Sequence, residues 1–552
     1  MFFEDRTGRV ARSPYRTDVA LFVGHVDRRR RCHERGGAPD DRTIVYPVLP
    51  RGGARHERHE GLPWLRRWLH AEGWARADRP VNEAADLDEL LDVPVPIDRF
   101  ETFDQLFAWD HRPVGEGARE RVADTYLGAA VRAFFAQGGR LCYVLRVGEP
   151  WAVPTTPAES QAVVRERAAR LQALVPGALG GVGASPVERA TWRGVFSLYG
   201  LPDVSLVCVP ELPDVVRTHF DEEAPLPPPP APSVAFLECS EGELVPAESS
   251  VRHLHAPACD ADGYLDWARA LSCFTAELAA PRAASSLREV QLLAAVPRPH
   301  ARLAVTDLRK YLDELVGWNR RPAGLSVPVD AGGLSSAFLQ LVYPWLRTES
   351  SRRLPGGIEP PDAALAGVIA RTALDRGCYW SVAGQPMRGV LGHDPELSAR
   401  DVGNPEDLGS LGGRVSLVGP RPGGTEVLSD VTTSLDSTFR LAHANRALSA
   451  IVRVLRTLGE EQTFAPSNEA TWSMLRSRVR DVLREFWVEG ALRGATEAEA
   501  FSVRCDRSTM TQDDLDAGRL VVVVEMTLSV SIQRIHVVLT RTGDTVQLER
   551  AA

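Results

Sequence analysis

Histidine and cysteine side chains that could bind a metal ion occur in two places along the 552-residue chain. The first group is Cys32, His33, His56 and His59, and the second is His253, His255, Cys259 and Asp260. Zinc sites draw on closely spaced pairs of such ligands, and neither group has that spacing. The sequence HERHE at residues 56–60 also differs from HExxH, because its second histidine comes one position early. We therefore expect polar surface loops at both places, with no metal ion and no cofactor.

Two other short patterns suggest chemistry, and each has a simpler structural explanation. Asp513, Asp514 and Asp516 could hold a cation, but they lack the EF-hand pattern and favour an acidic turn. Residues 177–183 (GALGGVG) do not match GxGxxG and predict a turn. The sequence contains no GxSxG nucleophile elbow and no coherent serine, histidine and aspartate set. A hydrolase on an α/β scaffold is the enzymatic alternative, but we expect no catalytic activity.

Four arginines lie close together near the start of the last hundred residues. They are Arg476, Arg478, Arg480 and Arg484. Apolar residues recur at helical spacing through the same segment, so the arginines are expected on the outer face of a helix. Such a face is usually charged because it contacts solvent, which is one interpretation. The other is that Arg476, Arg480 and Arg484 face an acidic partner.

Composition and charge describe an ordinary globular protein with ample core-forming material. Apolar residues make up 44% and charged residues 25% of the chain, and its length suits about three domains. The formal net charge of −9 argues against a general nucleic-acid-binding protein. The eight cysteines form no CxxC pair and are expected to be reduced, buried thiols. The first residues lack the apolar core of a secretion signal, and no apolar run is long enough to span a membrane.

Hydrophobic patterning in the first part of the chain predicts alternating strands and helices. Residues 19–26 and 141–147 are expected strands, and residues 125–137 form an expected helix that stops at Gly138. Continuous apolar runs at residues 204–210 and 290–296 are typical of parallel strands covered on both faces. Further elements are expected at residues 160–176, 303–316, 336–346 and 360–371. The pattern indicates an α/β architecture.

The last part of the chain predicts a pair of helices followed by strands. Residues 437–458 and 469–489 each carry an apolar stripe, and each is followed by a glycine. Residues 519–528 and 534–542 are apolar and rich in β-branched side chains, which predicts strands. This part of the sequence therefore predicts an α+β architecture.

Several of these segments, in this order along the chain, resemble contractile tail sheath proteins of phages and of phage-like extracellular injection systems. The N-proximal block of the family is similar to residues 17–26, 97–107 and 126–147. Its central domain, whose topology is like that of subtilisin, is similar to residues 201–212, 290–297, 338–346 and 360–384. Its C-terminal domain is similar to residues 439–539. Together these segments cover about two thirds of the chain.

The resemblance implies a multidomain α/β and α+β fold with extended terminal arms. The implied parts are an N-terminal arm (1–18), an N-proximal α/β segment (19–150), a central sheath domain of subtilisin-like topology (151–400), a C-terminal inner sheath domain (401–533) and a C-terminal arm (534–552). Residues 36–93 and 214–285 do not match the family and are expected to be surface insertions.

What the resemblance implies for function is a structural protein and not an enzyme. Sheath subunits form a helical stack of hexameric rings around an inner tube and contract to drive the tube through a target envelope. The implied partners are other copies of the chain, the inner tube protein, baseplate and cap proteins and, as an open alternative, a paralogous sheath subunit. Nucleic acid and membrane insertion are not expected.

The implied location is the bacterial cytoplasm during synthesis, and then a phage tail or a phage-like injection particle that can be released from the cell. The insertions and the arginine-rich composition favour an injection system over a phage tail. A sheath-related tail terminator or baseplate component is the alternative function.

The resemblance also implies that terminal arms pair with the sheets of neighbouring subunits. The residues expected in this pairing are Val19, Leu21, Val23, Leu520, Val522, Val524, Ile535, Val537 and Leu539. Strand addition supplies main-chain hydrogen bonds that persist while domains rotate. The alternative is that residues 535–548 fold back onto their own domain as a hairpin about Gly543 and Asp544. In this reading Arg476, Arg480 and Arg484 face the inner tube.

Overall fold

The computed structural model describes most of the chain, in sixteen ranges. These are residues 16–29, 63–76, 79–82, 85–115, 121–180, 183–218, 251, 253–279, 289–299, 334–396, 411–461, 466, 468–513, 520–529, 536–542 and 545–551. Among them, every helix is too short or too polar to cross a membrane. The helix expected at residues 303–316 lies outside the described residues.

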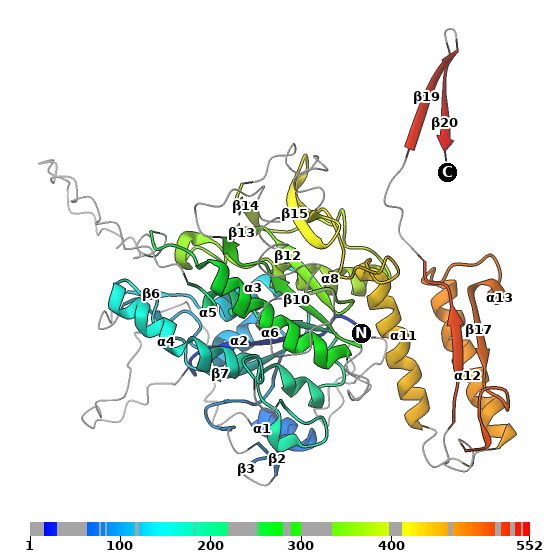
Figure 1. Ribbon diagram of the computed structural model, residues 1–552, viewed down its shortest axis with the longest axis horizontal. Coiled ribbons are helices and arrows are strands. Elements are labelled where there is room, and N and C mark those ends of the chain that lie inside the picture. The colour runs from blue at the N-terminus through cyan, green and yellow to red at the C-terminus, as the bar shows by residue number, and fades with distance from the viewer. Residues whose placement is uncertain are drawn as a thin grey trace, which may run out of the picture.

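An eight-stranded mixed sheet forms the centre of the molecule, and six neighbouring strands in it are parallel (Figure 1). In spatial order the strands are β16 (Gly424–Val427), β15 (Val415–Arg421), β12 (Leu339–Tyr343), β10 (Gln291–Ala295), β8 (Leu206–Cys208), β1 (Ala20–His25), β7 (Cys142–Gly148) and β4 (Val95–Ile97). Strands β4 and β16 are antiparallel to their neighbours at the two ends. Every residue of β1, β8, β10 and β12 is buried, so both faces of the sheet are covered.

The order of the parallel strands is that of a doubly wound sheet. Numbered along the chain, the six strands from β7 to β15 lie in the order 2-1-3-4-5-6, which extends the doubly wound order 2-1-3-4-5. The chain reverses direction across the sheet between β1 and β8. The expected mixed α/β architecture is confirmed, whereas the narrower subtilisin-like topology stays a prediction.

Helices cover the sheet and also form part of the C-terminal region of the molecule. They are α1 (Pro63–Ala71), α2 (Phe100–Leu106), α3 (Tyr126–Gln137), α4 (Pro157–Leu174), α5 (Leu212–Val215), α6 (Ala261–Ala279), α8 (Asp362–Arg376), α11 (Ala442–Glu461), α12 (Glu469–Val488) and α13 (Glu497–Ala500). Short 3₁₀ turns occur at Arg189–Thr191, Gly194–Gly200 and Pro355–Gly357.

Helices α3 and α8 pack closely against each other and against the central strands. Thr125 caps the start of α3 by accepting a hydrogen bond from the backbone N–H of Gly128, and Gly138 ends it in the left-handed conformation at φ 109°. The close approach depends on Gly367 in α8, because a Cβ atom there would lie 2.5 Å from the carbonyl oxygen of Phe134. The helix expected at residues 125–137 is thereby confirmed.

Small two-stranded sheets extend from the body. They pair β2 (Ala75–Arg76) with β3 (Arg79–Pro80), β5 (Arg112–Pro113) with β6 (Val122–Ala123), β9 (Ala258–Cys259) with β11 (Arg298–Pro299), and β13 (Trp345–Thr348) with β14 (Val390–Asp394). The first of these and α1 are described parts of the segment expected to be an insertion at residues 36–93.

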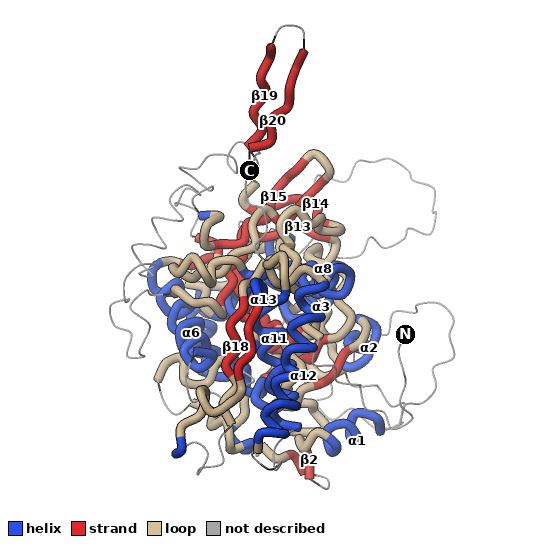
Figure 2. Tube along the Cα trace, turned by 90° about the vertical axis from the view of Figure 1, so that its right-hand side faces the viewer, coloured by secondary structure: helices blue, strands red, loops and turns tan. Residues whose placement is uncertain are grey.

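The C-terminal unit, a name used here for the described residues between 442 and 529, lies beside the sheet body (Figures 1 and 2). It contains α11, α12 and α13 and the antiparallel pair β17 (Phe501–Arg504) and β18 (Val523–Met526). Beyond it, β19 (His536–Thr542) pairs with β20 (Thr545–Ala551). The predicted order of two helices and then strands is confirmed, although β18 is shorter than the expected strand.

The expected divisions at residues 150 and 400 do not follow the sheet. Strands β1, β4 and β7 come from the expected N-proximal segment, and β15 and β16 come from the expected C-terminal domain. All five are strands of one sheet with β8, β10 and β12, so these segments share a single core. Residues 411–427 therefore belong structurally to the body, and the separate C-terminal part begins near α11.

Candidate assembly surfaces

A small apolar core holds the C-terminal unit together. It contains Ile451 and Val454 of α11, Leu475 and Phe486 of α12, and Phe501 of β17. The apolar stripes that the sequence showed in both helices meet here, because residues at helical spacing share one face. Asn468 caps α12 by accepting a hydrogen bond from the backbone N–H of Thr471. The result is a helix pair that covers one face of the β17–β18 sheet.

The β17–β18 sheet presents unpaired backbone edges. Its register runs from Phe501 opposite Met526 to Arg504 opposite Val523, and no third strand joins it among the described residues. The side chains of Leu520, Val522 and Val524 are half-buried against the helix pair. These three residues therefore pack within their own unit, and the feature left for a partner is the backbone edge of the strand.

Strands β19 and β20 form a hairpin that stands apart from the rest of the molecule (Figures 1 and 2). The pairing runs from His536 opposite Ala551 to Thr542 opposite Thr545. Val537 and Leu539 lie in β19, whereas Ile535 and the turn residues Gly543 and Asp544 lie outside the described residues. The two strands therefore form a hairpin, which is one part of the alternative that residues 535–548 fold back onto their own domain. The hairpin adds no strand to β17–β18, however, within the part of the chain described.

The structure places Val19, Leu21 and Val23 at the centre of the body. Leu21 and Val23 belong to β1, which pairs with β7 on one side and with β8 on the other. All three side chains are fully buried, and the carbonyl of Val19 already accepts from Ser205 and Leu206 of its own chain. The expectation that these residues pair with another subunit is wrong, because both backbone edges of β1 are occupied within the chain.

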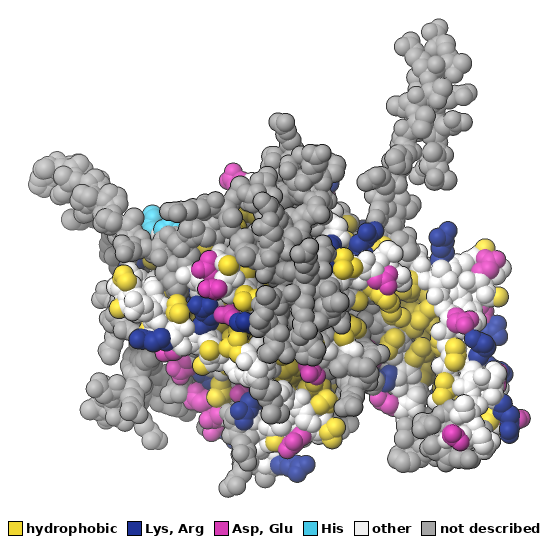
Figure 3. All heavy atoms as spheres, viewed as in Figure 1, with side chains coloured by type: hydrophobic (Ala, Val, Ile, Leu, Met, Phe, Trp, Pro, Cys, Tyr) yellow, Lys and Arg dark blue, Asp and Glu magenta, His cyan; other side chains and the backbone are white. Residues whose placement is uncertain are grey.

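The arginines of α12 lie on its exposed face, and several are paired with glutamates. Arg480 and Arg484 both bind the carboxylate of Glu497 in α13, and Arg478 binds Glu461 at 3.1 Å. The two guanidinium groups lower the pKa of Glu497. The exposed acids Asp481 and Glu485 lie on the same helix, and Figure 3 shows basic side chains with acidic ones among them along the outer side of the C-terminal unit.

Buried acidic groups, which sequence reasoning missed, gather near the amino ends of α3 and α8. Burial raises the pKa of Asp124 to about 7, that of Glu359 to about 8 and that of Asp362 to about 7. Arg353 partly offsets the effect at Asp124, and a hydrogen bond from Thr348 at 2.7 Å does so at Glu359. No local pattern marks these residues, because each becomes buried only through contacts between distant segments.

The point where the strand order reverses is filled by protein side chains. Nδ1 of His25, at the end of β1, lies 3.0 Å from the carboxylate of Glu211, and both side chains are almost fully buried. The His25 ring packs edge-on against Trp151 at a centroid distance of 5.2 Å. Doubly wound folds bind ligands at this place, and here the buried pair and the indole take up the space.

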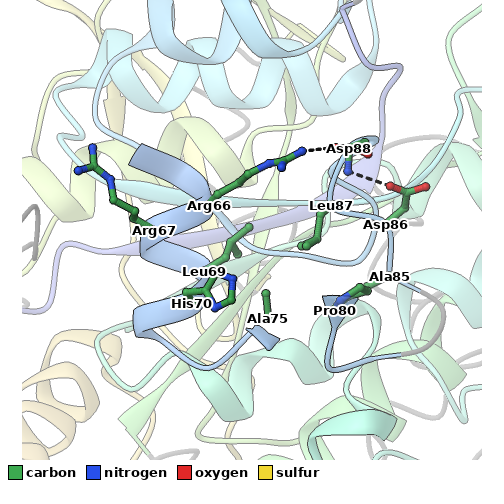
Figure 4. Close-up of a pocket in the computed structure, with 10 residues that line it drawn as sticks. All are labelled: Arg66, Arg67, Leu69, His70, Ala75, Pro80, Ala85, Asp86, Leu87 and Asp88. Atoms are coloured by element: carbon green, nitrogen blue, oxygen red, sulfur yellow. Dashed lines mark hydrogen bonds and ion pairs between the residues drawn. The ribbon is translucent and has the colours of Figure 1, made fainter. Parts of the chain in front are cut away.

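A cavity near the surface lies in the expected insertion and not beside these elements. It measures about 530 Å³ and is bordered by α1, β2, β3 and residues 85–88 (Figure 4). Arg66 reaches from α1 to the carboxylate of Asp88, and Leu69, Ala75 and Leu87 make much of the wall apolar. Among the described residues that line it, no nucleophilic side chain is paired with a general base.

Those candidate metal ligands that the structure describes form no metal-binding cluster. Cys32, His33, His56 and His59 lie outside the described residues, as do Asp514 and Asp516. His253, His255, Cys259 and Asp260 are described, and Cys259 is fully buried with burial raising its pKa. Among the described residues, no group of three or more His, Cys, Asp or Glu side chains could hold a metal ion.

Comparison with known proteins gives one similar sequence and several similar structures. No family model matches the chain. The tail sheath protein of Burkholderia phage BcepMu is 24% identical over 206 residues, which are 36% of this chain and 42% of that protein. The match therefore spans less than half of that relative.

Two of the similar solved structures match over nearly the whole chain. A chain in the cryo-EM structure of the anti-feeding prophage baseplate, 6-fold symmetrised, has a TM-score of 0.51 at 16% identity and covers 96% of this chain and 94% of its own. A chain of the anti-feeding prophage helical sheath in the contracted state has a TM-score of 0.50 at 16% identity, with 99% and 98% covered. The resemblance to contractile tail sheath proteins is thus confirmed, and the chain has the fold of that family.

Proposed function

We propose that the protein is a structural sheath subunit that assembles around an inner tube and contracts. The β19–β20 hairpin is the observation that carries this proposal. An isolated two-stranded hairpin is marginally stable in water and needs further strands or a helix to cover it. Since it joins no other strand among the described residues of its own chain, its partner is expected on another copy.

The receiving surface is the free edge of the β17–β18 sheet on a neighbouring subunit. Adding an arm there makes a larger sheet, gives the edge the hydrogen bonds it lacks, and links subunits by main-chain contacts. Ile535, Val537 and Leu539 form the donated strand, and Leu520, Val522 and Val524 belong to the receiving one. The first residues of the chain, before residue 16, are proposed as the second arm.

The exposed face of α12 is proposed to meet the inner tube. Arg476, Arg480 and Arg484 would contact acidic side chains on the outer wall of the tube. Glu497 holds two of these guanidinium groups in place. Such complementary charge orients partners and speeds their encounter more than it strengthens binding.

The assembly we propose consists of helically stacked hexameric rings, with baseplate and cap proteins at its ends. The relatives in solved structures are described as a helical sheath in contracted state and as a 6-fold symmetrised baseplate, which supports this arrangement. A paralogous sheath subunit is a further partner to test. The particle would be a phage tail or a phage-like injection system, built in the bacterial cytoplasm. Residues 36–93 and 214–285 are proposed to lie on its outer surface.

A second candidate is a baseplate component, because two similar chains belong to baseplate structures. Electron microscopy of the full chain, alone and co-expressed with a candidate inner tube protein, separates the two functions. Long hollow cylinders, wide alone and narrow around a tube, are expected of a sheath subunit. Closed rings that never stack would indicate the baseplate role, and monomers in both preparations would contradict self-assembly.

A further inference from the structure

Helix α11 sends a buried arginine into the sheet body. Arg453 has a side chain that is 3% exposed, and its five N–H donors match five acceptor contacts. Nε and one terminal nitrogen donate to the carboxylate and the carbonyl of Glu289, at 3.2 and 3.4 Å. The other contacts are to the carbonyls of Arg16, Asp203 and Val204, at 2.6, 3.3 and 2.8 Å. One side chain therefore joins segments from four parts of the sequence.

The acceptors lie at the amino ends of three adjacent strands. Arg16 precedes β1, Val204 precedes β8 and Glu289 precedes β10, and these strands are neighbours in the order β10-β8-β1. Parallel strands that start side by side place these carbonyls close together, where a planar guanidinium can reach several at once. Arg453 thus ties α11 to the amino ends of these central strands. Doubly wound folds bind ligands at the opposite, carboxyl ends.

A second buried ion pair fixes α11 two turns away. Arg446 donates to both oxygens of Asp430, at 3.1 and 2.6 Å, and both side chains are at most 5% exposed. Asp430 also accepts from the side chain of Gln340 in β12 and from the backbone N–H of Val382. Residues seven apart on a helix lie on similar faces, about 10 Å apart along the axis.

Two separated anchors constrain a helix in a way that one cannot. With one anchor, α11 could pivot about the attachment point. With two, the direction of its axis is set relative to the sheet, and Ala450, Ile451 and Val454 of the same helix belong to the apolar core of the C-terminal unit. Both anchors are charge-assisted and buried, and such bonds are shorter and stronger than neutral ones.

We infer that Arg446 and Arg453 mount α11 rigidly on the sheet, so that the sheet body and the C-terminal unit move as one piece. Arg453 also holds Arg16, the first described residue of the chain, against α11, the helix that carries the C-terminal unit. This inference deepens the proposed function, on which its consequence for contraction rests. A pull on either arm would then rotate the whole subunit and would not bend it between its two parts.

The test measures a distance between the two parts of the full-length chain. Spin labels on non-canonical amino acids at Val187 in the body and Val488 in the C-terminal unit avoid the native cysteines, and both positions are well exposed. The unaltered chain is expected to give a single narrow distance distribution. Combining Arg453→Met with Asp430→Asn and Arg446→Met is expected to abolish that single peak, because both anchors are removed.

The variants are chosen so that folding is retained. In Arg453→Met, Glu289 still has Arg456 at 2.8 and 3.1 Å, so no buried charge is left alone. Asp430→Asn with Arg446→Met removes both charges of the second pair together. Arg456→Met is the matched control, because it removes a partner of the same Glu289 from the same helix without touching a strand carbonyl among the contacts described. This control is expected to keep the narrow peak.

Hydrogen exchange of the unaltered chain gives a test that needs no substitution. Backbone amides of β1, β8 and α11 are expected to exchange as one cooperative unit, since Arg453 joins all three. A narrow peak retained in the combined variant, or exchange of α11 well ahead of β1 and β8, would overturn the inference. Both measurements report on the inside of one chain, with labelled chains diluted into unlabelled ones in the first, so failure of the chain to form sheaths would count against the proposed function alone.

Discussion

At the scale of single residues, the buried carboxyl groups are the least expected feature of this protein. Asp124, Glu359 and Asp362 all have raised pKa values in the folded chain, and burial is the main cause at each. Carboxylates in the unfolded chain have pKa values near 4. At pH 6.5 the folded protein therefore holds protons on these groups that the unfolded chain releases.

The stability of the protein is accordingly expected to fall as pH rises from 6.5 to 8. Unfolding releases protons in this window, so higher pH favours the unfolded state, by up to about 1.4 kcal/mol per pH unit for each group still protonated. Denaturant unfolding at several pH values measures the slope. Glu359→Gln keeps a neutral side chain and is expected to reduce the slope. Identical slopes for both proteins would show that Glu359 is ionised in the folded state.

Exposed arginines on α12 give a second prediction at this scale. Reversing two of them with Arg476→Glu and Arg480→Glu is expected to abolish co-assembly with the tube protein while leaving the chain folded. The matched control, Arg99→Glu with Arg165→Glu, makes the same charge change on exposed positions of the sheet body. Sedimentation and electron microscopy at low and raised salt report the outcome. Equal tube binding by the two double variants would show that α12 does not face the tube.

At the scale of elements, two glycines in helices should respond oppositely to the same substitution. Gly367→Ala brings a methyl group to 2.5 Å from the carbonyl oxygen of Phe134, so α3 and α8 must separate. A loss of about 1–3 kcal/mol in unfolding free energy is expected. Gly459 in α11 is exposed with open space around it, so alanine there should add up to about 1 kcal/mol through helix propensity. A change of the same sign in denaturant unfolding of both variants would contradict this account.

The β19–β20 hairpin gives a second prediction at the scale of elements, concerning assembly. Deleting residues 534–552 is expected to leave the melting temperature unchanged, because β19 pairs only with β20 in the described chain, yet to prevent sheath formation. The full-length variant Val537→Asp with Leu539→Asp should behave alike if the strand is donated to a neighbour. Circular dichroism and electron microscopy measure the two properties. Normal cylinders from either variant would rule out the hairpin as the linking arm.

At the scale of the whole molecule, the chain consists of a sheet body, a C-terminal unit and a detached hairpin. Arg446 and Arg453 tie the C-terminal unit to the sheet body. Among the described residues, the hairpin pairs with no strand of either part. A rigid piece with a projecting arm suits an assembly whose subunits rotate while remaining linked. The same division explains why the loss of an arm should spare folding, whereas the loss of both anchors should change the shape of the subunit.

Much of the secondary structure could be predicted because it depends on local pattern. The strands near residues 19–26 and 141–147 and helices α3, α8, α11 and α12 follow apolar spacing and end signals that lie within each segment. The outward position of the α12 arginines followed from the same periodicity. The error at Val19, Leu21 and Val23 has a physical reason: an apolar strand looks the same in sequence whether its edges are filled by its own chain or by another.

Residue type and short-range spacing were enough to predict where most helices and strands form, which faces are apolar, and which family the chain resembles, because each of these depends on local pattern. The strand order, the single sheet that joins segments expected to be separate, and the raised pKa values of the buried acids became apparent in the folded chain. Only the tertiary structure brought Arg453 to Arg16, 437 positions apart in the chain. Such contacts depend on how the strands line up in space, and no local pattern contains that information.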